Sequence, residues 1–233
     1  MNIRGILAVA VLAAVLAPGT GSRAADDAGS AAEMIAFVRQ GNIWVAKADG
    51  TGERRLTGLG ACGGPALSPD GKRAAFHCRG DQDIYPDTGF GRIYLVETAG
   101  GEPKPLRFEG ILAAEHPSFS PDGESLVFVG LSEVKMKGEG EAALVHASMS
   151  LCVGHIQSGK VRTILRQRNV MLDAGTVYGN PAFSPDGQWI LWQQSGSDVS
   201  GGFAITDLKG KTLFRFPAKG DDPTPYWGAS LAP

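Results

Sequence analysis

Short apolar or alternating runs, each introduced by a turn sequence, recur along most of this chain. Examples are Ala74–His77, Leu126–Val129 and Trp189–Trp192. Runs of four to eight such residues between turn residues are typical of β-strands rather than helices. The pattern therefore predicts an all-β domain built from short antiparallel hairpins.

A turn sequence containing Ser-Pro-Asp-Gly occurs three times. Its copies are Pro65–Gly71, Pro117–Gly123 and Pro181–Gly187. Proline fixes φ at the first corner of a tight turn, aspartate bonds to nearby backbone, and glycine accepts a positive φ. We therefore interpret Asp70, Asp122 and Asp186 as turn residues, not as a ring of metal-binding or catalytic carboxylates.

Two further strands follow each hairpin, so each repeat predicts four antiparallel strands. The third strands are Arg92–Glu97, Ser150–Ile156 and Phe203–Leu208, and the fourth are Pro105–Phe108, Val161–Leu165 and Thr212–Phe216. Long loops are expected at 80–91, 130–148 and 195–202, with a long connection at 167–179. Loops of this length commonly carry binding residues.

The two ends of the repeat region are complementary. Met34–Val38, Asn42–Ala46 and Arg54–Leu56 indicate second, third and fourth strands without a first, and Pro225–Ser230 indicates a first strand alone. Pairing the two terminal segments would complete a sheet and remove the open edges. We predict a four-bladed β-propeller of four-stranded antiparallel blades, with one blade built from both termini over residues 34–230. A half-ring that dimerises into an eight-bladed ring is the alternative.

These motifs resemble the TolB-type, WD40-like propeller repeat of exported bacterial proteins. The resemblance rests on Pro-x-Phe-Ser-Pro-Asp-Gly, on Asn42–Val45 with Asp49–Leu56, and on Ile93–Val96 with Gly100–Leu106. The chain departs from TolB in having four repeats rather than six and no separate amino-terminal domain. The resemblance implies a protein- or peptide-binding scaffold of the cell envelope.

The first residues have the features of an export signal. Arg4 precedes the apolar run Ile6–Ala17, and Ser22-Arg23-Ala24 offers small residues for cleavage after Ala24. We expect residues 1–24 to be removed, residues 25–33 to be a flexible terminus, and the protein to be periplasmic or secreted. The run is too short to span a bilayer, and an uncleaved anchor helix is the alternative.

Composition supports a turn-rich globular domain. The 233 residues include 33 glycines and 14 prolines with 43% hydrophobic residues, which argues against both a helix bundle and disorder. The formal net charge of −2 and the absence of a basic run argue against nucleic-acid binding.

The cysteines follow the hairpin geometry. Cys62 and Cys78 are equally spaced from the turn at Ser68–Lys72, which makes them cross-strand neighbours, and export permits a disulfide between them. Cys152 lies in an apolar strand and is expected to be a buried free thiol.

The best candidate binding site lies where the innermost strands begin. Glu115 and His116 precede Pro117, and Gly64, Asn180 and Thr224 are the equivalent positions in other repeats. With neighbouring residues, the predicted ligand- or partner-binding set at this axial mouth is Glu115, His116, Tyr178, Asn180 and Asp222. The alternative is that these are solvated loop residues.

No catalytic constellation is evident. The four histidines lack metal-ligand spacing, and no cue supplies a nucleophile with its base. We therefore predict a non-enzymatic binding module without a cofactor, whose partner is an envelope protein or peptide. The alternative is a glycan-active lyase or hydrolase at the axial mouth using His116. Three acids in Asp81–Asp87 suggest calcium only weakly, because the glycine spacing of a calcium loop is missing.

Overall fold

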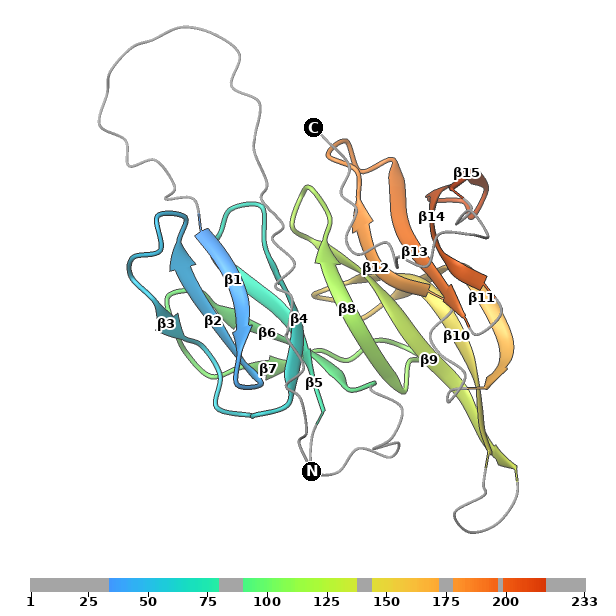
Figure 1. Ribbon diagram of the computed structural model, residues 1–233, viewed down its shortest axis with the longest axis horizontal. Helices are drawn as coiled ribbons and strands as arrows, with labels where there is room; N and C mark the ends of the chain where they lie inside the picture. The colour runs from blue at the N-terminus through green and yellow to red at the C-terminus, as the bar shows by residue number, and fades with distance from the viewer. Residues whose placement is uncertain (1–33, 80–89, 138–143, 172–177, 197–198, 217–233) are drawn as a thin grey trace, which may run out of the picture.

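The computed structural model describes residues 34–79, 90–137, 144–171, 178–196 and 199–216. These residues form strands, turns and bends arranged as four antiparallel sheets (Figure 1). No helix among them is long and apolar enough to cross a membrane.

Each sheet is one blade of a four-bladed β-propeller, and the blades follow one another in chain order. Blade 1 contains β1 (Met34–Arg39), β2 (Asn42–Lys47) and β3 (Arg54–Arg55). Blade 2 contains β4 (Cys62–Leu67), β5 (Arg73–Cys78), β6 (Arg92–Glu97) and β7 (Lys104–Pro105). Blade 3 contains β8 (Ala113–Phe119), β9 (Ser125–Lys137), β10 (Leu144–His155) and β11 (Val161–Met171). Blade 4 contains β12 (Tyr178–Phe183), β13 (Trp189–Gly196), β14 (Val199–Asp207) and β15 (Thr212–Phe216).

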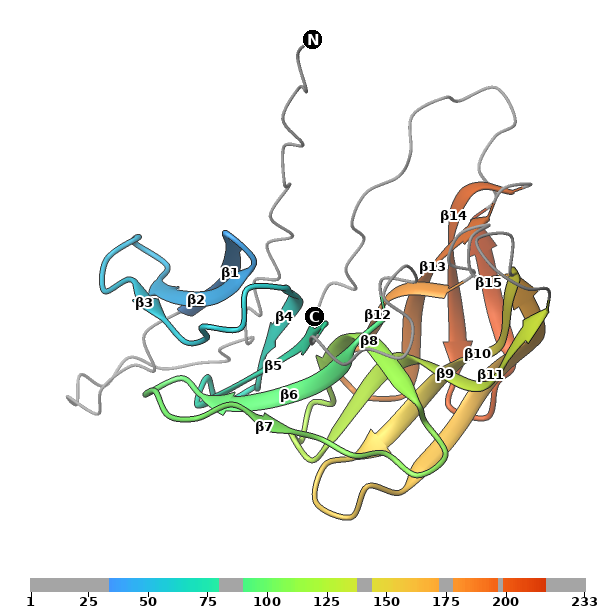
Figure 2. The ribbon, with the colours of Figure 1, turned by 90° about the horizontal axis from the view of Figure 1, so that it is seen from below.

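The blades form an arc with the first strands of blades 2 to 4 on its inner side (Figure 2). Strands β4, β8 and β12 are neighbours there, so residues at matching positions on them share one surface. This confirms the predicted propeller. The segment Pro225–Ser230, expected to complete blade 1, lies outside the described residues, and the closure of the ring stays a prediction.

Aromatic side chains at one repeated position fill the space between blades. Phe76, Phe128 and Trp192 occupy equivalent places in the second strands of blades 2, 3 and 4, and each is at most 2% exposed. Each belongs to a different cluster of buried apolar residues. Burying such a side chain contributes about 1.5–3 kcal/mol, which explains why an aromatic recurs there.

The Ser-Pro-Asp-Gly turns confirm the structural interpretation of their aspartates. In each turn the serine hydroxyl donates to the aspartate, at 2.6 Å in Ser68–Asp70, 2.5 Å in Ser120–Asp122 and 2.6 Å in Ser184–Asp186. The same carboxylate oxygen accepts the backbone N–H two residues later. These bonds lower the pKa of all three carboxyl groups.

The prediction of a loop at 130–148 is wrong for most of that segment. Strand β9 continues to Lys137 and β10 begins at Leu144, so only 138–143 lies outside the described residues. Buried Leu131 pairs with buried Met149 and extends the apolar face of the sheet outward. Lysines interleaved with Val134 and Met136 hid this alternation. Strands β11, β13 and β14 likewise extend into the loops expected at 167–179 and 195–202.

The first hairpin of blade 2 carries a disulfide. Cys62 and Cys78 are directly paired across β4 and β5, and their sulfurs are bonded. Cys152 is a buried free thiol, and burial raises its pKa to about 11. A thiol that stays protonated at neutral pH is a poor nucleophile, so Cys152 has a packing role.

Candidate functional site

The three inner strands share an uncommon backbone feature just before their prolines. Gly64, His116 and Asn180 have φ of 54°, 51° and 43°, and each lies within a register shift of its strand. The residue before a proline normally adopts an extended conformation, and only glycine enters the left-handed region readily. The three positions, which the repeats predicted to be equivalent, therefore share the same unusual backbone conformation.

His116 and Asn180 hold this conformation at a cost. A non-glycine residue in the left-handed region is destabilised by about 1–2 kcal/mol relative to the right-handed one. Blade 2 avoids the cost with Gly64, whereas blades 3 and 4 carry polar side chains instead. Strain retained in a polar residue is a feature of binding and catalytic sites.

His77 on β5 joins this surface from the second strand of blade 2. Its ring lies so close to the inner strand that a Cβ on Gly63 or Gly64 would come within 3.1 or 3.0 Å of it. The backbone N–H of His116 donates to His77 Nδ1 at 3.3 Å, and the two rings meet edge to face with centroids 5.3 Å apart. Because Nδ1 accepts, Nε2 carries the proton of the neutral ring.

The charge state of His77 follows from its surroundings. Its pKa is lowered to about 3, mainly by burial and to a smaller extent by the neighbouring charges of His116 and Arg79. His77 is therefore neutral at physiological pH and acts as a hydrogen-bond acceptor that links blade 2 to blade 3.

Glu115 and His116 bring two unsatisfied polar atoms together. Glu115 is only 6% exposed, and its Oε1 lies 3.6 Å from His116 Nδ1, which is too long for a hydrogen bond. Both atoms are buried and have no hydrogen-bond partner in the described part of the chain. An unsatisfied buried polar group costs about 1–3 kcal/mol, so a ligand that bonds to this pair would recover that energy.

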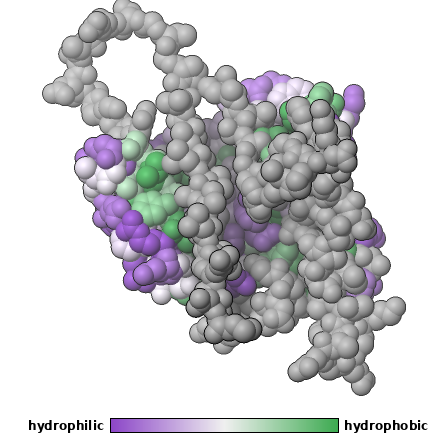
Figure 3. Space-filling model, viewed as in Figure 1, coloured by the Kyte–Doolittle hydropathy of each residue, from purple (hydrophilic) through white to green (hydrophobic). Residues whose placement is uncertain are grey.

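Asn180 occupies the same position in blade 4 and is exposed. Its side-chain Nδ2 donates to Gln193 Oε1 at 3.0 Å. Gln193 pairs with Gly179 as His77 pairs with Gly63, so the facing position on the second strand is polar in both blades. The surface formed by Glu115, His116 and Asn180, with His77 and Gln193 behind it, is called the axial mouth below. In Figure 3 hydrophilic residues are visible in the middle of the molecule, between the grey segments.

The other two predicted residues have different positions. Tyr178 is 7% exposed, and its ring packs edge to face on Trp192 with centroids 5.2 Å apart, so the ring belongs to the core between blades 3 and 4. Burial raises its pKa. Asp222 lies outside the described residues.

Sequence reasoning missed His77 and Gln193 as parts of this surface. Both lie on second strands, and no motif in the sequence singled them out as site residues. The hairpin symmetry that pairs Cys62 with Cys78 also places His77 opposite Gly63, and this was the available signal. The described residues contain no group of three or more histidine, cysteine, aspartate or glutamate side chains placed to hold a metal ion.

Comparisons with known proteins support the fold rather than a function. No protein-family model matches the chain. It is 28% identical over 181 residues to the uncharacterized peptidase YuxL of Bacillus subtilis, a match that covers 65% of this chain and 24% of that protein. The chain thus spans about a quarter of that relative's length.

Two solved structures illustrate the structural likeness. The nidogen/laminin complex contains a chain with a TM-score of 0.53 and 15% identity, covering 79% of this chain and 59% of that one. TolB from Acinetobacter baumannii has a TM-score of 0.41 and 17% identity, covering 80% of this chain and 52% of that one. The nidogen/laminin likeness, at low identity, shows a shared fold and nothing finer.

Proposed function

We propose that this chain is a non-enzymatic binding module that holds an extended segment of a protein or peptide at its axial mouth. The observation that carries the proposal is the pair formed by Glu115 Oε1 and His116 Nδ1, two buried polar atoms 3.6 Å apart that have no hydrogen-bond partner among the described residues. A scaffold needs such a preformed polar anchor, whereas catalysis would need a nucleophile and its base.

One residue of an extended segment matches the chemistry of this pair. Its own N–H donor and C=O acceptor point to the same side of the strand. The Glu115 carboxylate accepts from the N–H, and His116 donates to the carbonyl when its Nδ1 carries the proton. Asn180 offers a further amide on the next inner strand, and Asp222 is proposed to join it from the carboxy-terminal segment.

The partner is proposed to be an envelope protein, met in the periplasm or outside the cell. The export signal expected at residues 1–24 supports this compartment, and so does the Cys62–Cys78 disulfide, since disulfides persist in oxidising compartments. The resemblance to TolB-type repeats also supports an envelope partner.

The test is capture of partners from envelope extract by the immobilised chain and its variants. Glu115→Gln removes the charged acceptor, and His116→Gly copies the residue that blade 2 carries at the equivalent position, so the backbone conformation is retained. Both variants are expected to lose the captured proteins. Glu102→Gln, which changes an exposed acid in the connection between β6 and β7, is expected to retain them. An unchanged set of captured proteins for both mouth variants contradicts the proposal.

The alternative, a glycan-active enzyme at the same mouth, is favoured by one observation, the closeness of Glu115, His116 and His77. Incubating the chain with acidic oligosaccharides and measuring metal content distinguish the two. Cleavage of the oligosaccharide, together with a stoichiometric metal that is lost in His116→Gly, would support the enzyme and contradict the binding proposal.

A further inference from the structure

A second site is formed where two β-bulges meet on the outward extension of blade 3. On β9, Glu133 and Val134 lie opposite the single residue Ala147 of β10. On β11, Arg168 and Asn169 lie opposite the single residue Ser148. The two bulges are thus at the same level on either side of β10. Bulges re-aim side chains and are over-represented next to functional sites.

Glu133 is strained at its bulge. Its φ is 54°, in the region that glycine normally occupies in a bulge of this kind. The Ser148 hydroxyl donates to Glu133 Oε2 at 2.7 Å and fixes the carboxylate over the sheet. That hydrogen bond lowers the pKa of Glu133, and the positive charges of Arg168, Arg166 and Lys135 lower it further.

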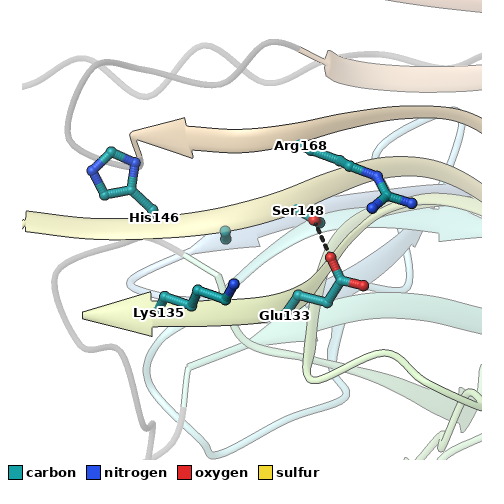
Figure 4. A pocket seen from close by; sticks show the side chains of 6 residues that line it. Glu133, Lys135, His146, Ser148 and Arg168 are labelled. Carbon is teal, nitrogen blue, oxygen red and sulfur yellow. Dashed lines mark hydrogen bonds between the residues drawn. The ribbon is translucent and has the colours of Figure 1, made fainter. Parts of the chain in front are cut away.

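Between the bulges lies an open hollow of about 140 Å³ (Figure 4). It is lined by Glu133, Lys135, His146, Ala147, Ser148 and Arg168. A cavity of about 150 Å³ holds a benzene-sized group, whereas drug-sized ligands need roughly 300–1,000 Å³. The hollow therefore suits one functional group of a larger ligand.

The lining favours a singly charged anion. Lys135 and Arg168 are two cations against the one anion Glu133, so these three side chains together carry one net positive charge. Within the described ranges neither cation has an ion-pair partner within 4.0 Å. His146 Nδ1 is buried and, among the described residues, unpartnered. A monoanion balances this one net positive charge, whereas a dianion would leave an excess negative charge beside Glu133. A planar carboxylate also matches the two parallel N–H groups of a guanidinium.

We propose that this hollow, formed by the paired bulges of β9 and β11, binds the carboxylate group of an acidic ligand. In this proposal Arg168 donates to both carboxylate oxygens and Lys135 adds a charge-assisted hydrogen bond. The hydrogen bond from Ser148 holds the Glu133 side chain in place beside them. The site is on the outward extension of blade 3 and is separate from the axial mouth, so this proposal does not depend on the function proposed there.

The test is an NMR titration of the isotope-labelled chain with acetate, with acetamide as a neutral probe of the same shape. Acetate is expected to shift the backbone amide resonances of Lys135, His146 and Ser148 in a saturable way, and acetamide is not. Arg168→Gln and Lys135→Gln are each expected to weaken acetate binding by about tenfold, because hydrogen bonds to charged groups are stronger than neutral ones. Arg92→Gln, an exposed arginine on β6, leaves it unchanged.

Two further probes identify the source of the carboxylate. N-acetyl-glutamate methylamide represents an acidic peptide, and methyl galacturonide represents an acidic glycan. The probe that binds more tightly identifies the class of ligand. Equal shifts with acetamide, tighter binding of inorganic phosphate than of acetate, or an unchanged acetate affinity in Arg168→Gln overturns the proposal. Failure of both larger probes to bind while acetate binds also overturns it, since the hollow would then not admit a ligand's carboxylate.

Discussion

The backbone N–H of His116 donates a hydrogen bond to Nδ1 of His77, and this bond joins the inner strand of one blade to the second strand of the blade before it. The contact requires no side chain on Gly63 or Gly64, because a Cβ there would crowd the His77 ring. The left-handed backbone of His116 aims its N–H toward the ring. One histidine thus fixes the position of the other at the axial mouth.

Lowering the pH should weaken the fold through His77. Its pKa is about 3 in the folded chain and near 6.5 when unfolded, so between these values only the unfolded chain takes up the proton. Stability from this group is therefore complete at pH 7 and is lost as the pH falls below 6.5. Between pH 7 and pH 5 the expected loss in the free energy of unfolding is about 1–2 kcal/mol.

His77→Gln supplies the comparison, because Gln193 occupies the equivalent position in blade 4. Urea unfolding at both pH values should show a smaller loss in His77→Gln than in the wild type. Identical losses would mean that His77 is not neutral and enclosed in the folded chain.

Asn180 should tolerate glycine and reject valine. Glycine relieves the left-handed strain and loses only an exposed hydrogen bond to Gln193, so Asn180→Gly is expected to lie within about 0.5 kcal/mol of the wild type. Asn180→Val should destabilise by about 1–2 kcal/mol or more, because a β-branched residue is poorly accommodated there. Lys104→Val, on an exposed strand, is the control for added valine. Equal effects of glycine and valine in urea unfolding would contradict the strain argument.

Removing a turn aspartate should destabilise its hairpin. Asp122→Ala loses the bonds from the Ser120 hydroxyl and from the N–H of Glu124, and the expected cost is about 1–2 kcal/mol. Glu124→Ala, the adjacent exposed acid, should change stability little. Thermal unfolding with and without calcium separates the interpretations: a calcium-dependent rise in Tm that Asp122→Ala abolishes would indicate a metal site instead.

The disulfide should be a substantial part of the stability of blade 2. Cys62 and Cys78 are 16 residues apart in sequence, and a crosslink closing a loop of this size contributes about 3 kcal/mol in the chain-entropy description. The double variant Cys62→Ala, Cys78→Ala should lose about 2–4 kcal/mol in urea unfolding. A reducing agent should lower the stability of the wild type and leave that of the double variant unchanged; if both respond alike, the disulfide is not the cause.

Much of the fold could be predicted because its signals are local. A Ser-Pro-Asp-Gly turn sets its own geometry through bonds among residues such as Ser68, Asp70 and Lys72. The register of β4 with β5 follows from that turn, and with it the Cys62–Cys78 pair. The extension of β9 and β10 could not be predicted, because Lys135 and Glu133 resemble loop residues until the facing strand covers their apolar neighbours.

The sequence by itself determined the repeat, the turns, the strand order within each blade and the equivalence of Gly64, His116 and Asn180, because each depends on residues close together in the chain. Only the tertiary structure decided which side chains meet. The stacking of blade 2 on blade 3 placed His77 against His116, and core packing placed the ring of Tyr178 against Trp192. Two bulges on different strands created the hollow at Glu133 and Arg168. Such contacts join residues far apart in sequence, and their geometry depends on how whole sheets pack against one another.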